Sequence, residues 1–284
     1  MPSLLFFCRA LATRSCCLPP KPQPPISATR RYLLVTQRHE PIFNVPPVVI
    51  ATIAVLAVVH ALRVLILTAA QDDQFLLTFA FIPARYAPPL AAGSFPGGLG
   101  ADVWTFFTYA FIHANLVHIG LNLAWLLPFG TAVARRFGAW RYVLFMLVTS
   151  ATGALAYLID DPDPMAPMIG ASAAISGAMA AAMRFAFQPS GLLFGDGEIY
   201  RVPARPLLAT LTDFRFLLFL AVWLGLNALF GLGTTSIGGE DGEALAWQAH
   251  IGGFLAGLVL FNIFDPVASR VALDGKPGNI EPRG

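Results

Sequence analysis

Four polar residues lie inside otherwise apolar stretches of the sequence: His118, Asn122, Ser172 and His250. If these stretches cross a membrane, such side chains are costly to bury and by default indicate a functional site. A serine hydroxyl becomes a nucleophile when a base within hydrogen-bond reach takes its proton, and an imidazole can be that base. Taken alone, however, a serine or a histidine in such a segment is more often structural.

The small residues around Ser172 and His250 predict how these two groups meet. Gly170 and several alanines surround Ser172, and Gly253 and Gly257 form a Gly-x3-Gly pattern beside His250. Small residues at this spacing let two helix backbones approach closely in a membrane. We therefore expect the two helices to pack face to face, with the Ser172 hydroxyl against the His250 imidazole.

A further histidine precedes the pair formed by His118 and Asn122. Those two residues are four positions apart and share one face of a helix. His113 is five positions before His118, about 140° around the same helix. We therefore expect His113 to point away from His118 and to stabilise a neighbouring loop or span by a hydrogen bond.

The composition places these residues in an integral membrane protein. Of the 284 residues, 56% are hydrophobic and 12% are charged, against about 25% charged in typical soluble domains. The net charge is +2 without a dense basic patch, so nucleic-acid binding has no support. The three cysteines lie within the first 17 residues, so neither a disulfide framework nor a cysteine metal site is expected in the apolar body.

Six apolar stretches approach the length of about 20 residues that a membrane-spanning helix needs. They cover residues 47–70, 105–134, 142–159, 168–183, 216–233 and 244–264. The sequence thus predicts an all-α polytopic membrane protein, a bundle of six transmembrane helices. Ser172 would lie about one turn inside the fourth span, and residues 71–103 would form a long outer loop.

The charges between the spans predict the orientation. All lysines and arginines except Arg63 and Arg85 lie before the first span, after the last, or in the second-to-third and fourth-to-fifth connections. The positive-inside rule then places both termini in the cytoplasm. In that orientation the polar residues lie roughly 5–20 Å below the outer surface, where one outward-open cavity could contain them all.

Three regions follow from this pattern. Residues 1–40 are a basic, proline-rich leader, expected to be disordered or to reflect a misassigned start. Residues 41–267 form the six-helix membrane domain, and residues 268–284 form a short cytoplasmic tail.

Together the motifs resemble the rhomboid family of intramembrane serine proteases, over about residues 41–264. The family patterns are His-x4-His-x3-Asn, Gly-x-Ser and Ala-His-x2-Gly-x3-Gly. In this sequence they are found at His113–Asn122, Gly170–Ser172 and Ala249–Gly257. Each pattern alone is weak, but three of them in the right order and on the right spans are a specific signal.

The resemblance implies a role for each matching residue. Ser172 would be the nucleophile and His250 the general base of a Ser-His dyad. His118 and Asn122 would help the backbone N–H of Ser172 to stabilise the oxyanion. Because the spans contain no acidic residue, helix packing would have to orient the histidine. The resemblance implies no cofactor and no metal, and it gives supporting roles to His113, Gly170, Gly253 and Gly257.

Three positions depart from the family pattern. Ala173 follows the nucleophile where many members have glycine, and its methyl group lies beside the backbone donor. Ser176 replaces an aromatic residue that often stacks on the histidine. Ala134 replaces an acid at the cytoplasmic end of the second span, which concerns stability. None of these changes removes an atom of the dyad.

Three functions remain open from the sequence. The first is an endopeptidase in the bilayer that cleaves transmembrane protein substrates near their outer end, where small or helix-destabilising residues let the chain unwind. The second is a rhomboid-like pseudoprotease that binds membrane clients without cleavage. The third is a metal-binding or transport protein that uses His113, His118 and His250. The six-span core favours a bacterial inner membrane with the site open to the periplasm; the basic leader suggests a mitochondrial alternative. The sequence does not indicate the oligomeric state.

Overall fold

The computed structural model describes residues 45–87, 95–160, 164–187, 198–231 and 246–267. The chain divides into two units, Met1–Asn44 and Val45–Gly284, and all described residues belong to the second. The predicted leader (1–40) and the predicted tail (268–284) therefore lie outside the described residues. Within the described ranges the structure is helical, and its one β-type pairing is an isolated bridge between Phe81 and Met168.

A helix is present at each of the six predicted positions. Four helices are long and apolar enough to cross a membrane: α2 (Pro47–Ile66), α5 (Leu116–Phe137), α6 (Ala139–Asp160) and α10 (Trp247–Phe264). The other two, α7 (Ser172–Ala186) and α9 (Phe214–Gly231), are shorter. The predicted all-α class is confirmed, and four of the six predicted spans meet the length and composition needed to cross a bilayer.

The prediction that residues 71–103 form a loop is wrong, because most of the described part is helical. The segment contains α3 (Ala69–Phe79), the 3₁₀ turn η1 (Pro83–Tyr86) and the first part of α4 (Gly98–Thr108). At the start of α3, the side chain of Gln71 accepts a hydrogen bond of 2.9 Å from the backbone N–H of Thr68. This reciprocal capping box stabilises the first turn of a helix that lies in the predicted loop.

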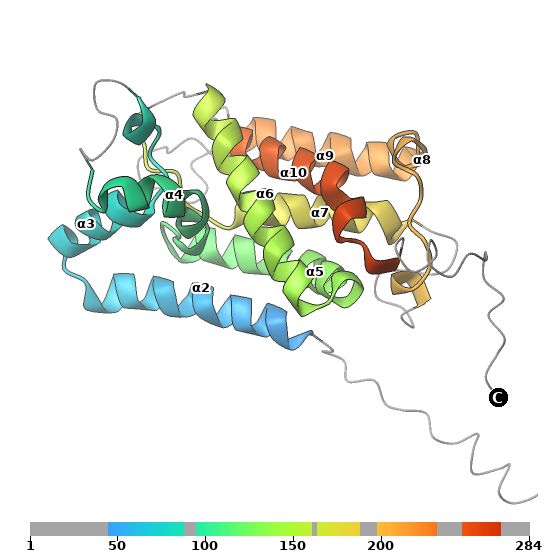
Figure 1. Ribbon diagram of the computed structural model, residues 1–284, viewed down its shortest axis with the longest axis horizontal. Helices are drawn as coiled ribbons and strands as arrows, with labels where there is room; N and C mark the ends of the chain where they lie inside the picture. The colour runs from blue at the N-terminus through green and yellow to red at the C-terminus, as the bar shows by residue number, and fades with distance from the viewer. Residues whose placement is uncertain (1–44, 88–94, 161–163, 188–197, 232–245, 268–284) are drawn as a thin grey trace, which may run out of the picture. The chain divides into compact units, whose positions relative to one another are not determined.

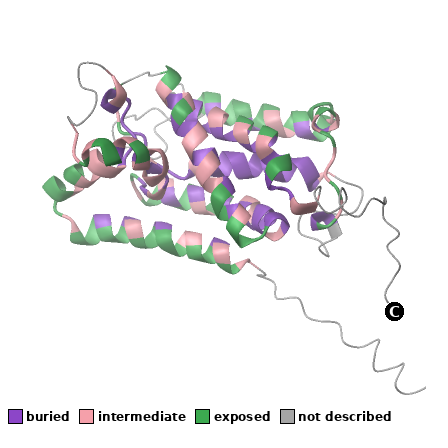
Figure 2. Ribbon diagram, in the orientation of Figure 1, coloured by how far each residue is buried: buried purple, intermediate pink, exposed green. Residues whose placement is uncertain are grey.

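The helix that carries Ser172 occupies the centre of the bundle. α7 packs against α5, α6 and α10, and every residue from Ala173 to Ala186 is buried (Figures 1 and 2). Fifteen residues rise about 22 Å, less than the roughly 30 Å of a bilayer core. The short length of α7 is compatible with its position because neighbouring helices, rather than lipid, surround it.

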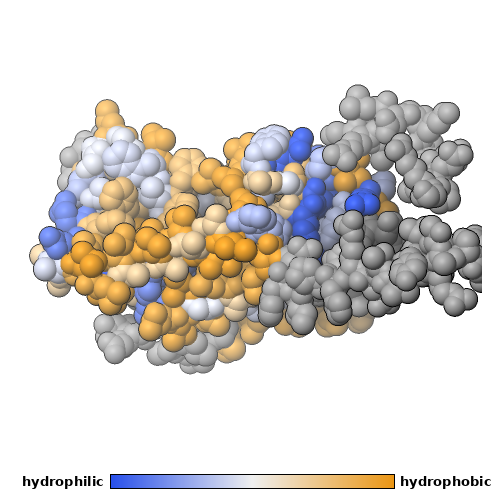
Figure 3. Space-filling view, turned by 90° about the horizontal axis from the view of Figure 1, so that it is seen from below, coloured by the Kyte–Doolittle hydropathy of each residue, from blue (hydrophilic) through white to orange (hydrophobic). Residues whose placement is uncertain are grey.

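The outer helices present apolar side chains to the surroundings. Leu62, Val64 and Leu65 of α2 are exposed, as are Leu218 and Val222 of α9. Figure 3 shows a broad hydrophobic area on one face of the molecule. In water such an area would be an aggregation hazard, whereas lipid tails would cover it without cost. This surface agrees with the membrane location predicted from the composition.

Glycines set the close approach of α10 to its neighbours. A Cβ atom placed on Gly253 would lie 2.0 Å from the carbonyl oxygen of Ala173, and one on Gly257 would lie 2.2 Å from that of Gly177. Real Cβ atoms do not tolerate such distances, so the two backbones touch only because side chains are absent there. The predicted face-to-face packing of these two helices is confirmed.

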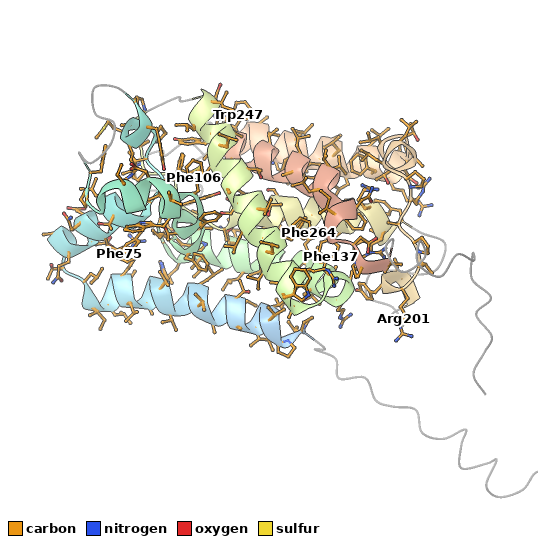
Figure 4. All side chains as sticks on the ribbon, in the orientation of Figure 1. Phe75, Phe106, Phe137, Arg201, Trp247 and Phe264 are labelled. Atoms are coloured by element: carbon orange, nitrogen blue, oxygen red, sulfur yellow. The ribbon has the colours of Figure 1, made fainter. Side chains whose placement is uncertain are left out.

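A buried ion pair joins the ends of α5 and α10. Arg136 donates from Nε to Oδ1 of Asp265 at 3.0 Å and from Nη2 to Oδ2 at 2.8 Å. Its Nη1 donates to the carbonyl of Ile199 in the 3₁₀ turn η3 (Glu198–Tyr200), which precedes α8 (Leu207–Leu211). Both charged residues are buried, and Phe137 and Phe264 stack beside them with ring centroids 6.2 Å apart (Figure 4).

Replacing Asp265 by alanine should lower the free energy of unfolding by about 3–5 kcal/mol, because the Arg136 guanidinium would stay buried without its counter-charge. Thermal unfolding in mild detergent would measure the change. The control is Asp213→Ala. Hydrogen bonds from Arg205 and from the backbone N–H of Arg215 lower the pKa of Asp213. Arg205 is partly exposed, however, so water can solvate its guanidinium when Asp213 is removed, and the loss of stability should be smaller. A shift for Asp265→Ala no larger than that of the control would contradict the prediction.

Candidate active site

Ser172 is held at the first residue of α7 by the segment that precedes this helix. Phe81 and Met168 exchange backbone hydrogen bonds of 3.1 and 2.8 Å, and the N–H of Gly170 donates to the carbonyl of Tyr109 at 3.0 Å. Gly170 has a φ of +116°, a conformation that favours glycine. Ser172 was expected one turn inside its helix, but it begins the helix. The backbone N–H groups there have no partners within the helix and can bind an anion.

The side chain of His250 meets Ser172 from α10. Nε2 of His250 lies 2.7 Å from Oγ of Ser172, which is hydrogen-bond distance. His250 is buried, and Ser172 is of intermediate exposure. A hydroxyl and an imidazole nitrogen at this distance can exchange a proton, which is the arrangement that activates a serine nucleophile.

A third side chain contacts the other nitrogen of this imidazole. Nδ1 of His250 lies 2.7 Å from Oδ1 of Asn227, a buried residue of α9. Asn227 was not among the residues predicted from the sequence. An amide inside the apolar stretch 216–233 is as costly as the polar residues that drew attention in the other spans, so the same criterion would have found it.

His118 lies beside the serine from the side of α5. A Cβ atom on Gly170 would lie 2.6 Å from Nε2 of His118 and 3.7 Å from Oγ of Ser172, so both groups border the same small space. The backbone N–H of Ala114 donates to Nδ1 of His118 at 3.4 Å. In a neutral imidazole whose Nδ1 accepts, Nε2 carries the hydrogen. His118 can thus present a donor N–H towards the Ser172 side of the site.

Asn122 is buried one turn further along α5. Its Nδ2 donates to the backbone carbonyl of His118 at 2.9 Å, and its Oδ1 is buried without a partner among the described residues. The predicted common helix face of His118 and Asn122 is therefore present. In the described part of the chain, the hydrogen bond of the Asn122 amide goes to the α5 backbone rather than to Ser172.

The position predicted for His113 is wrong. The rings of His113 and His118 are 5.1 Å apart between centroids, close to perpendicular, whereas one continuous helix would separate them by about 140°. The helix is not continuous: η2 (Tyr109–Phe111) ends before the extended residue Ile112, and α5 begins at Leu116. The carbonyl of His113 accepts a hydrogen bond of 2.9 Å from Nη1 of Arg63, which joins this break to α2.

The neighbours of Ala173 accommodate its extra methyl group. A Cβ atom on Gly153 of α6 would lie 2.6 Å from the Cβ of Ala173, so the absence of a side chain at Gly153 leaves the space that the methyl group fills. Ser176, one turn further along α7, is buried and has no ring to stack on His250. Among the described residues, no three His, Cys, Asp or Glu side chains are grouped so that they could hold a metal ion.

Comparisons with known proteins agree with these motifs. Residues 100–265, more than half of the chain, match the family model of the Rhomboid domain. The chain is 26% identical over 161 residues to the rhomboid protease GlpG of Haemophilus influenzae, covering 56% of this chain and 68% of that protein. It is 36% identical over 78 residues to the rhomboid protease GluP of Bacillus subtilis, covering 28% of this chain and 15% of that protein.

A human relative matches over a similarly short region. The chain is 35% identical over 77 residues to human Rhomboid-related protein 3, covering 27% of this chain and 19% of that protein. The chain thus spans less than a fifth of GluP and of the human protein. The fold and these matches define an integral, multi-pass membrane protein. The chain belongs to the rhomboid family.

Proposed function

We propose that this protein is an intramembrane serine endopeptidase that hydrolyses peptide bonds in or near transmembrane segments of membrane-protein substrates. The observation that carries the proposal is the 2.7 Å distance between Oγ of Ser172 and Nε2 of His250. The protease names of the GlpG and GluP relatives support the same activity.

In the proposed reaction, Nε2 of His250 takes the proton of the Ser172 hydroxyl while Oγ attacks the scissile carbonyl carbon. The carbonyl oxygen becomes an oxyanion, stabilised by the backbone N–H of Ser172 and by the Nε2–H of His118. His250 then returns the proton to the leaving amine, which departs and leaves an acyl-enzyme. Water, activated by the same imidazole, releases the second product. Asn122 contributes in this proposal through its remaining amide hydrogen.

We also propose a complete membrane topology, which the described residues support in part. Six spans with both termini in the cytoplasm would place the dyad in an outward-open cavity of a bacterial inner membrane, facing the periplasm. Residues 1–40 would be a leader, residues 41–267 the membrane domain and residues 268–284 a cytoplasmic tail. The supporting observation is that Arg136 and Arg184 lie at the last turns of α5 and α7, at the ends predicted to face the cytoplasm.

Labelling with a fluorophosphonate probe tests the activity of the serine without a known substrate. We expect the full chain, purified in mild detergent, to be labelled covalently, and Ser172→Ala to lose the labelling completely. Ser176→Ala is the matched control, because this serine is on the same helix one turn away; it should be labelled like the wild type.

Two other labelling results would contradict the proposal. No labelling of folded wild-type protein, in detergent and in liposomes, would reject the protease and favour a pseudoprotease that binds membrane clients. Labelling that persists in Ser172→Ala would place the reactive serine elsewhere.

A further inference from the structure

Two neighbouring contacts join α9 to α10 beside the dyad. The rings of Trp223 and Phe254 stack with centroids 4.4 Å apart, and Asn227 contacts His250 at 2.7 Å. Trp223 and Asn227 are four residues apart, as are His250 and Phe254, so each helix presents one apolar and one polar group on a single face. The stacked rings hold the two helices in the register that lets the polar pair meet.

The amide of Asn227 can have only one orientation in this position. Its Nδ2 donates to the backbone carbonyl of Trp223 at 2.8 Å. A carbonyl oxygen can only accept, so the NH₂ group must lie there and the amide oxygen must point to the imidazole. An amide oxygen also only accepts, and Nδ1 of His250 must therefore carry a hydrogen.

From this network we propose that Asn227 is a positioning residue that holds His250 in the tautomer and orientation its function as the base requires. With the proton on Nδ1, the lone pair of the neutral ring is on Nε2, which faces the hydroxyl of Ser172. This is the part that a buried carboxylate has in Ser-His-Asp triads. The inference rests on the proposed function for its catalytic meaning, but not for its geometry.

Burial makes this hydrogen bond important for the state of the ring. Asn227 and His250 have exposed fractions of only 7% and 8%. Bulk water therefore cannot readily replace the amide oxygen, and an unpaired N–H in such a place is costly. Ser176 has no ring that could orient the imidazole by stacking. Helix packing alone was expected to orient this histidine, and the structure adds a specific acceptor.

The tautomer of His250, and with it the function of this residue as the base, then depends on the position of α9. Ser172 and His250 are on α7 and α10, whose backbones touch, whereas Asn227 is on a helix with its other side exposed at Leu218 and Val222. A displacement of α9 that separated Asn227 from His250 would leave the dyad atoms on their helices but remove the acceptor for Nδ1.

The first test is the tautomer of His250 in the wild-type protein, read by ¹⁵N NMR of histidine-labelled protein. The chain has five histidines, and the signals that are missing in His250→Gln are those of the two ring nitrogens of His250. We expect a protonated Nδ1 and an unprotonated Nε2 at neutral pH. A ring protonated on Nε2 instead would overturn the proposal, without any need for an Asn227 variant to fold.

The second test is the rate of fluorophosphonate labelling in Asn227→Leu. We expect the maximal labelling rate to fall about 10- to 100-fold, part of the roughly 10²–10⁴-fold that a general base supplies. The probe concentration at half-maximal rate should stay the same, because Asn227 does not touch the probe. Leu226→Ala, at the adjacent, partly exposed position of α9, should leave both values unchanged.

The variant should also change the tautomer. We expect His250 in Asn227→Leu to give a mixture of the two neutral forms, whereas Leu226→Ala should keep the wild-type tautomer. An unchanged rate together with an unchanged tautomer would overturn the proposal. If wild-type protein is not labelled at all, the proposed protease function fails, while the tautomer still decides the role of Asn227.

Discussion

Alanine in place of Ser172 or of His250 should lower kcat for peptide-bond cleavage about 10⁴- to 10⁶-fold, and the double variant should lose no more than the single variants. The two side chains form one hydrogen-bonded unit at 2.7 Å, so each is without function when the other is missing. The residual rate would come from the oxyanion donors and from substrate binding, which both variants keep. Such non-additivity is the kinetic sign of a dyad.

The measurement needs cleavage in a bilayer rather than probe labelling. Single-span substrates with small or helix-destabilising residues near their outer end would be reconstituted with the enzyme in liposomes, and the product followed with time. Ser176→Ala serves as the control and should cleave at the wild-type rate. If the losses of the two single variants multiplied in the double variant, the residues would act independently and the dyad mechanism would be wrong.

The helices were predictable because long apolar stretches have few alternatives in a membrane. The ends and breaks of the helices were harder to predict. Residues 105–134 are apolar almost throughout, and composition does not show that the chain leaves the helix at Ile112. The break is marked only by Asn115, whose side chain caps the N–H of His118 at the start of α5. Because this break was missed, the angle expected between His113 and His118 was wrong.

The meeting of Ser172 and His250 was predictable for a different reason. The small residues of both helices mark the faces that can touch. Ser172 and His250 lie on these same faces, so the packing of the helices also brings their side chains together. The contact of Asn227 has no such local sign, since it depends on how α9 is rotated about its own axis. That rotation depends on side-chain packing between helices, including the stacking of Trp223 on Phe254.

The second large effect is expected from a change in the packing of α10 on α7. Replacing Gly253 by alanine should abolish labelling of Ser172 and lower the free energy of unfolding by about 1–3 kcal/mol, the usual cost of overpacking. The added methyl group would lie 2.0 Å from the carbonyl oxygen of Ala173, a backbone atom that cannot turn aside. The two helices must therefore separate at the level of the dyad, where a change of about 1 Å is enough to break a hydrogen bond of 2.7 Å.

Gly120→Ala is the matched control for this change. The same substitution on α5 adds a methyl group with no atom within 4 Å, so it meets no steric barrier. It should keep labelling and raise stability by about 0.5–1 kcal/mol, because alanine favours the helix more than glycine does. Wild-type labelling and an unchanged unfolding temperature in Gly253→Ala would show that α10 can move without disturbing His250. The close contact at Gly253 would then have no part in holding the base against the serine.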